Sequence, residues 1–280
     1  MLNMLHRLFA FLLLSSVFFA CSSAHNTLQH PTTSATLWTQ NSAEYSALTT
    51  SVYQTASSYL GLALEDSDWT AYPEQDGDNL RSKSPAIILD VDETVLDNSP
   101  FQARMIKQNS SFDPQQWNNW AMEAQADAVP GALAFTKLAA KKGVKIFYLT
   151  NREAKVEEGT RKNLEQLGFP LSENRDNILS NNERSNWTSA KTERRAYVAQ
   201  DHRIVMLFGD NLNDFILAKD ISRDERHQLV KTHQKKWGRK WFIFPNPVYG
   251  SWESALHNFD DSLSPSQIDS VKRERLDTKQ

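Results

Sequence analysis

The sequence predicts an α/β protein in which a parallel sheet is flanked by helices and carries a mainly helical cap. Four short apolar runs, near residues 85–90, 144–149, 204–208 and 241–244, have the length of buried strands, and helical patterns separate them. Asp90 and Thr150 are 60 residues apart. This is more than one crossover helix requires, so an insertion over about 97–129 is expected to form the cap.

Composition excludes several classes of protein. Hydrophobic residues make up 40% and charged residues 23% of the 280 residues, which are ordinary globular values. The formal net charge of −3 argues against a nucleic-acid partner bound by neutralising phosphates. The one cysteine, Cys21, excludes an internal disulfide framework and a cysteine-ligated zinc site.

The first residues have the pattern of a secretory signal. Arg7 precedes an apolar run over 8–19. A run of this length is too short for a bilayer core, which needs about 20 residues, but it suits the central part of a signal peptide over 1–20. We therefore expect the protein to be exported.

Cys21 is a candidate lipid attachment site. Ala20 and Cys21 resemble a bacterial lipobox, although Phe18 and Phe19 depart from its usual residues. Lipidation would predict an outer-membrane or cell-surface lipoprotein held by its N-terminal anchor. Cleavage after Ala24, giving a periplasmic protein, and an inert buried thiol are the alternatives.

The segments before the core are predicted from composition and periodicity. Residues 21–36 are rich in Ser, Thr, His and Gln and are expected to form a flexible tether. Apolar residues at three- and four-residue steps predict a helix over about 37–60. This helix belongs to an N-terminal helical segment, 37–84, that is expected to pack on the core or the cap, and residues 66–84 are expected to form a loop.

The core is expected over 85–259, with a charged tail over 260–280 that ends in a solvated helix. Capping residues, prolines, glycines and apolar spacing mark its helices. One predicted helix begins at Asp113-Pro114, and a second spans about 130–142. A third has Val156, Leu164 and Leu167 on one side and ends before Gly168, and a fourth spans about 190–200. A very short strand is expected at Ile178-Leu179.

Polar groups follow the predicted strands at the edge where an α/β sheet binds its ligands. They share a position at a strand end or at a helix start: Asp90 and Asp92, Thr150 and Asn151, Lys191, and Asp210 and Asp214. Each residue taken singly could be a helix cap or a surface group. Their joint occurrence in this order favours one site.

Two aspartates two residues apart suit a two-step phosphoryl transfer. One carboxylate can attack phosphorus, and the other can protonate the leaving oxygen and then activate water. A third aspartate can help to hold Mg²⁺, which prefers oxygen ligands. A hydroxyl and an ammonium group can neutralise the phosphoryl oxygens. A calcium loop starting at Asp90 is excluded, because Val95 stands where such a loop needs glycine.

The motifs ILDVDETVLDN, FYLTNR, GDNLNDF and PNPVYGSWE resemble those of the class C acid phosphatases. These are bacterial surface lipoproteins of the haloacid dehalogenase (HAD) superfamily that act as 5′-nucleotidases. The similarity spans about 37–259. It implies a HAD-like Rossmannoid fold, hydrolysis of phosphomonoesters at acidic pH, and Mg²⁺ as the cofactor.

The resemblance also implies a role for each motif residue. Asp90 would be the nucleophile and a metal ligand. Asp92 would be the general acid/base and would bind the metal through its backbone carbonyl. Asp210 would be the remaining protein ligand of the metal, and Asp214 would orient the site.

Three further residues would hold the phosphoryl group: Thr150, the Asn151 backbone and Lys191. The sequence thus predicts an exported, Mg²⁺-dependent acid phosphatase that acts on phosphomonoesters, with nucleoside 5′-monophosphates as the favoured class. Two alternatives stay open. One is a surface lipoprotein that binds nucleotides or other aromatic ligands without catalysis, and the other is a HAD phosphotransferase.

Aromatic residues could select the substrate. Trp117 and Trp120 in the cap and Tyr249 after the last strand are candidates for stacking on a base. Packing of the two tryptophans against the N-terminal helix is the competing interpretation. The aromatic-rich surface also makes a homodimer an expectation.

Overall fold

The computed structural model describes residues 30–173 and 176–279. The predicted signal peptide, Cys21 and most of the predicted tether lie outside the described residues. The chain divides into two units at residue 31, and the unit over 32–280 carries the fold. Among the described residues, no helix combines the length and the apolar character needed to cross a bilayer.

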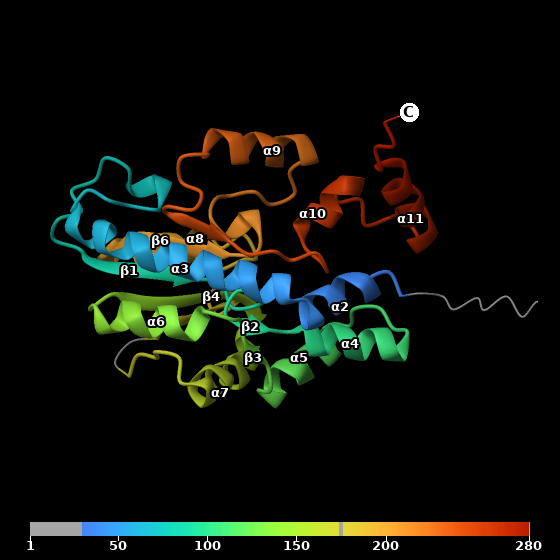
Figure 1. Ribbon diagram of the computed structural model, residues 1–280, viewed down its shortest axis with the longest axis horizontal. Coiled ribbons are helices and arrows are strands. Elements are labelled where there is room, and N and C mark those ends of the chain that lie inside the picture. Colours follow the sequence, from blue (N-terminus) through green and yellow to red (C-terminus); the bar gives the residue numbers. More distant parts are fainter. Residues whose placement is uncertain (1–29, 174–175, 280) are drawn as a thin grey trace, which may run out of the picture. The chain divides into compact units, whose positions relative to one another are not determined.

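Five strands form a parallel sheet in the order β5-β4-β1-β6-β7 (Figure 1). The strands are β1 (Ser84–Leu89), β4 (Lys145–Glu153), β5 (Ile178–Asn181), β6 (His202–Gly209) and β7 (Trp241–Ile243). β6 is buried along its whole length, as the continuous apolar runs predict for strands covered on both faces. The predicted parallel α/β sheet is confirmed.

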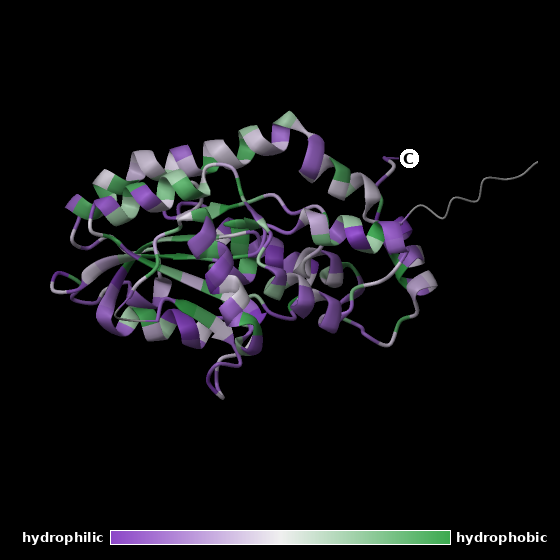
Figure 2. Cartoon of the chain, turned by 90° about the horizontal axis from the view of Figure 1, so that it is seen from below, coloured by the Kyte–Doolittle hydropathy of each residue, from purple (hydrophilic) through white to green (hydrophobic). Residues whose placement is uncertain are grey.

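Helices cover both faces of this sheet, and separate helices lie in the cap and in the C-terminal tail. They are α2 (Thr33–Asn41), α3 (Ala43–Glu65), α4 (Ser99–Gln108), α5 (Pro114–Glu123), α6 (Ala132–Lys141), α7 (Glu157–Leu167), α8 (Thr192–Asp201), α9 (Arg223–Thr232), α10 (Ser251–Ser254) and α11 (Pro265–Glu274). Ile87 and Leu89 pack in one apolar cluster with residues of α3 and α6, whereas Ile88 packs in a second cluster with residues of α8. In Figure 2 the strands are mostly hydrophobic and lie between helices of mixed character.

Residues 33–65 form two helices where the sequence predicts one. Ser42 separates α2 from α3, and its hydroxyl accepts a hydrogen bond from the Tyr45 backbone N–H at 3.1 Å. α2 begins at Thr33, so the predicted tether to residue 36 ends earlier than expected. The buried positions of α2 are Thr36 and Thr39. Apolar periodicity does not detect this face, because its residues are polar.

α3 packs across the centre of the sheet. The ring of Tyr53 stacks on Phe208 of β6 with centroids 5.8 Å apart, and it also contacts Phe135 and Phe244. Its hydroxyl donates to the backbone carbonyl of Thr94 at 2.7 Å. This helix therefore supports the chain just after β1, where the acidic motif lies.

The cap lies between β1 and α6. Two short antiparallel strands, β2 (Leu96–Asp97) and β3 (Asp127–Ala128), form its base, and α4 and α5 lie between them in the sequence. The carboxylate of Asp113 caps α5 by accepting from the Gln116 N–H at 2.8 Å, as the Asp-Pro signature predicts. The segment between the two short strands is mainly helical, in agreement with the predicted fold class.

Helix α9 was not predicted. None of its described side chains is buried, so it carries no apolar stripe that could reveal it. The sequence signal that remains is a capping box in which Ser222 and Glu225 bond to each other's backbone N–H.

Close packing of α7 on α5 gives a test of the cap. A Cβ added to Gly159 in α7 would lie 2.5 Å from the Ala121 carbonyl oxygen and 2.6 Å from the Met122 Cα of α5. We expect Gly159→Ala to lower the free energy of unfolding by about 1–3 kcal/mol, because backbone must move to admit the methyl group.

Gly61 in α3 provides the matched control. A Cβ at Gly61 meets no described atom within 4 Å. Gly61→Ala should therefore stabilise the protein by about 0.5–1 kcal/mol through helix propensity. Thermal and urea unfolding of both variants measure these changes, and equal effects at the two glycines would contradict the packing interpretation.

Candidate active site

Three carboxylates meet at the carboxyl edge of the sheet. Asp90 follows β1, and its backbone N–H donates to the Phe208 carbonyl of β6 at 2.9 Å. Asp210 follows β6, and Asp214 lies one turn further along the chain. The three side chains offer oxygens that lie within 4.8 Å of one another. The structure thus brings together residues of the motifs ILDVDETVLDN and GDNLNDF.

A tight turn folds Asp214 back toward β6. Its Oδ2 accepts from the Asn211 N–H at 2.9 Å, which closes a 3₁₀ turn over Leu212–Asp214. A Cβ at Gly209 would collide with the Asp214 carboxylate. Glycine is therefore required at the end of β6 for Asp214 to reach the site.

Lys191 lies buried between two of these carboxylates, with 4% of its surface exposed. Its Nζ donates to Asp214 Oδ1 at 2.6 Å and also to Asp90 Oδ1. The residue has a left-handed backbone (φ 61°) just before α8. Burial alone would lower the pKa of Lys191, but Asp214 and Asp90 outweigh it and the pKa lies above its ordinary value.

The carboxylates themselves are crowded. Burial raises the pKa of Asp90 well above its ordinary value; Lys191 opposes this shift, while Asp214 and Asp210 add to it. Burial, reinforced by Asp214, raises the pKa of Asp210 to about 7, although Asn246 donates to it at 2.7 Å and opposes the rise. A cation among these oxygens would favour their ionised forms. The donor set, consisting of carboxylate oxygens, fits Mg²⁺.

Asp92 lies beside this cluster, and donors from two elements hold it. Its Oδ1 accepts from Arg152 Nε and from Asn98 Nδ2, each at 2.9 Å. Thr150 Oγ1 donates to Oδ2 at 3.3 Å. Thr150 and Asn151 lie within β4, which runs on to residue 153, and do not follow the strand as the sequence suggested.

Arg194, which the sequence analysis did not single out, joins β4 to the segment before Lys191. Its Nη2 donates to Asn151 Oδ1 and to the Thr188 carbonyl, both at 2.7 Å, and its Nη1 donates to the Thr150 carbonyl. This buried guanidinium group therefore fixes the backbone that carries the predicted phosphate-binding residues.

The three aromatic candidates differ in their surroundings. Trp120 is 3% exposed and lies in the apolar core, where its indole N–H donates to Asn98 Oδ1 at 2.8 Å. This burial argues against a stacking role for Trp120. Trp117 is partly buried and packs edge-on against Phe101. The hydroxyl of Tyr249 donates to the buried carboxylate of Glu93.

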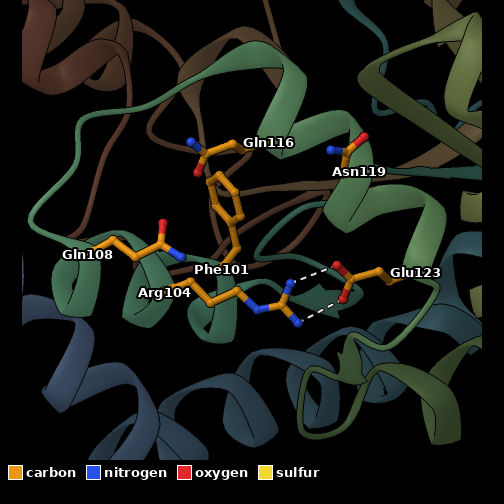
Figure 3. Close-up of a pocket in the computed structure, with 6 residues that line it drawn as sticks. All are labelled: Phe101, Arg104, Gln108, Gln116, Asn119 and Glu123. Carbon is orange, nitrogen blue, oxygen red and sulfur yellow. Dashed lines mark hydrogen bonds and ion pairs between the residues drawn. The ribbon is translucent and has the colours of Figure 1, made fainter.

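A separate cavity of about 310 Å³ lies in the cap (Figure 3). Arg104 of α4 and Glu123 of α5 form a two-pronged ion pair beside it, with distances of 2.8 and 2.7 Å. The predicted catalytic residues are not among its lining residues, which are Phe101, Arg104, Gln108, Gln116, Asn119 and Glu123. This cavity is therefore distinct from the carboxylate cluster.

Sequence reasoning missed the residues that position the predicted ones. Asn98, Glu93, Arg152 and Asn246 all stand inside the motifs that carry the resemblance, but no role was assigned to them. The available signal was their place in those motifs. Their partners become visible only when the cap and the strands meet.

Comparison with solved structures shows a related protein with the same fold. A class C acid phosphatase from Bacillus anthracis superposes with a TM-score of 0.78 at 37% sequence identity, covering 90% of this chain and 98% of that one. The same values hold for that enzyme's structure with tungstate bound.

Sequence comparisons point to the same family. Acid phosphatase 1 from Solanum lycopersicum is 32% identical over 163 residues, which are 58% of this chain and 57% of the plant protein. The chain therefore spans little more than half of that relative. Residues 16–252 match the family described as HAD superfamily, subfamily IIIB (acid phosphatase). The chain belongs to the subfamily IIIB acid phosphatases of the HAD superfamily.

Proposed function

We propose that this protein is an exported, Mg²⁺-dependent phosphomonoesterase whose favoured substrates are nucleoside 5′-monophosphates. The observation that carries the proposal is the buried Asp90 carboxylate, which contacts Lys191 and has two further carboxylates beside it. Asp92, two residues on, completes the pair of acids that the reaction needs.

In the first step, an Asp90 oxygen attacks phosphorus and the ester P–O bond breaks. Protonated Asp92 gives its proton to the leaving oxygen, and an aspartyl-phosphate remains on Asp90. The Lys191 ammonium group offsets the charge on the phosphoryl oxygens, together with the Thr150 hydroxyl and the Asn151 backbone N–H.

In the second step, ionised Asp92 takes a proton from water as the water oxygen bonds to phosphorus. The bond between phosphorus and the Asp90 oxygen breaks, which releases inorganic phosphate and restores the carboxylate. Both steps use Asp92 in opposite protonation states. The Asp92 carboxylate must therefore keep its position while it loses and regains a proton.

Asp90 and Asp210 would hold Mg²⁺, with Asp214 and Lys191 orienting them and the Asp92 backbone carbonyl as a further ligand. The bound ion would supply positive charge to the phosphoryl oxygens. The crowding of buried carboxylates supports this assignment, because a divalent cation relieves their mutual repulsion.

Tyr249 and Trp117 are the candidates for selecting an aromatic leaving group. The hydrogen bond to Glu93, the residue that follows Asp92, fixes the position of the Tyr249 ring near Asp92 in space. A ring held in this way can stack on a base without losing much side-chain freedom on binding. Homodimer formation stays a prediction.

Asp90→Asn tests the proposed chemistry. It should lower phosphate release by about 10⁴-fold or more, because an amide cannot replace the nucleophile. The assay measures inorganic phosphate from several nucleoside monophosphates and simple esters, with far-UV circular dichroism as the control for folding. Retained turnover in the variant would contradict the assignment.

The same assay separates the two alternative functions. Binding of nucleotides without any turnover in the unmodified protein would favour a binding lipoprotein. Product formation that requires an added alcohol acceptor would favour a phosphotransferase.

Tyr249→Ala tests whether the Tyr249 ring stacks on the base of the substrate. It should raise KM for nucleoside monophosphates by about 5- to 150-fold, because base stacking contributes about 1–3 kcal/mol. Glycerol phosphate, which lacks a ring, serves as the matched substrate and should change little. An equal loss on both substrates would exclude stacking on this residue.

Asp210→Asn tests the metal site. With Mg²⁺ at 100 times its dissociation constant, binding should stabilise the unmodified protein by about 2.7 kcal/mol. For a chain of this size that is roughly 5–10 °C in melting temperature. The variant should lose most of this shift, and activity should disappear when a chelator removes the metal.

Asp176→Asn is the matched control for the metal test. Asp176 belongs to a second acidic group, with Glu157 and Glu183, and it is exposed. Its loss should leave the Mg²⁺-dependent shift in melting temperature unchanged. A normal shift in Asp210→Asn would place the ion elsewhere.

We also propose that Cys21 carries a lipid that anchors the protein to the outer membrane or cell surface. Ser22 follows it, where inner-membrane retention would favour aspartate. Labelled palmitate should enter the unmodified protein and be absent from Cys21→Ser. A mature N-terminus just after Ala24, found by mass spectrometry, would contradict lipidation.

A further inference from the structure

The two oxygens of Asp92 have different surroundings. Oδ1 receives three donor contacts: Arg152 Nε at 2.9 Å, Arg152 Nη2 at 2.8 Å and Asn98 Nδ2 at 2.9 Å. Oδ2 accepts from the Thr150 hydroxyl at 3.3 Å, close to the limit for a hydrogen bond. The Asp92 side chain is 16% exposed. One oxygen is thus tied down, and the other is loosely held.

Arg152 is itself fixed from several directions. Its side chain is 1% exposed, and its Nη1 donates to Thr160 Oγ1 of α7 at 3.1 Å. Its Nη2 also donates to Asn98 Oδ1 at 3.0 Å, and the Trp117 ring lies 5.4 Å from its central carbon. A planar guanidinium group held by three elements cannot turn to follow another partner.

Asn98 is the second donor to Oδ1, and its amide has a defined orientation. Its Oδ1 accepts from both Arg152 and the Trp120 indole N–H, at 3.0 and 2.8 Å. Because both partners donate, the amide oxygen must face them, and Nδ2 must face Asp92. Trp120 therefore orients Asn98 from the core of the cap.

We propose that Arg152 is a positioning residue for the proposed phosphatase reaction, which fixes Asp92 through Oδ1 so that Oδ2 carries the proton. A proton on Oδ1 would point at N–H groups that have no lone pair to receive it. Oδ2 lacks this obstacle. It gives the proton to the leaving oxygen in the first step and takes one from water in the second, as described above.

Leaving groups of different basicity test this inference, which rests on the proposed function. An alkyl ester needs protonation as its P–O bond breaks, whereas p-nitrophenolate leaves without it. Loss of the Arg152 contacts to Asp92 Oδ1 should therefore lower kcat/KM for an alkyl ester much more than for p-nitrophenyl phosphate. For Arg152→Met we expect the ratio of the two values to fall about 100-fold, within the range that general acid catalysis contributes.

Two more variants keep the test independent of folding. Arg152→Lys keeps a cation but loses the planar guanidinium group with its paired N–H donors. Its ratio of the two kcat/KM values should lie between those of Arg152→Met and the unmodified protein. Trp120→Phe removes the indole N–H that orients Asn98, and it should lower the ratio about 3- to 10-fold. If Arg152→Met does not fold, the Trp120→Phe ratio decides.

Arg203→Lys is the control for disturbing a buried arginine. Arg203 is buried and donates to the backbone carbonyls of Ala63, Asp66 and Trp69 at 2.7–3.0 Å, away from the carboxylate cluster. Its replacement should leave the ratio unchanged.

Equal losses of kcat/KM on both esters in the Arg152 and Trp120 variants would contradict the positioning role of Arg152. The proposed function would not be affected by that result. If the unmodified protein releases phosphate from neither ester, the proposed function itself fails.

Discussion

The burial of several carboxylates around one ammonium group is the constraint on which the site depends. Asp90 and Asp214 both contact Lys191, and Asp210 lies within reach of them. Removing like charges from water is costly unless each finds a partner. Lys191 stabilises two of them, and the remaining negative charge leaves a group of carboxylates that could hold a divalent cation. A cation bound there would supply the positive charge that an anionic phosphoester needs, so that a basic surface would not be required.

The fold meets this constraint through backbone geometry. Parallel strands bring the ends of β1 and β6 to one edge, where Asp90 bonds to the carbonyl of Phe208. Gly209 leaves room for Asp214 to turn back, and the left-handed backbone of Lys191 directs its side chain inward before α8 begins. Asp90, Lys191 and Asp214 are too far apart in the sequence to meet on the surface of one helix. The site therefore depends on the edge of the sheet at which the ends of β1 and β6 meet.

Much of this arrangement could be predicted from the sequence, and the parts that could not have physical reasons. Strands such as 204–208 are continuous apolar runs, and charged residues at their ends are conspicuous. α9 buries none of its described side chains and α2 buries threonines, so apolar periodicity misses both helices. The partners of Arg152 lie 54 and 60 residues away at Asn98 and Asp92, so their contact depends on how the cap docks on the strands. Trp120 has the correct residue type for stacking, but only the packing of the cap shows that its side chain is buried in the core.

Asn98 links the two halves of the site. Its backbone N–H donates to Glu93 Oε1 at 3.1 Å, while its side chain bonds Asp92, Arg152 and Trp120. Glu93 in turn holds Tyr249. The cap therefore helps to position Asp92, the proposed general acid, and Tyr249, the proposed stacking residue. A cap that swung away as a separate lid would break several buried hydrogen bonds, each costing about 1–3 kcal/mol when its partner is left unpaired. This cost favours a cap whose helices α4 and α5 remain in place.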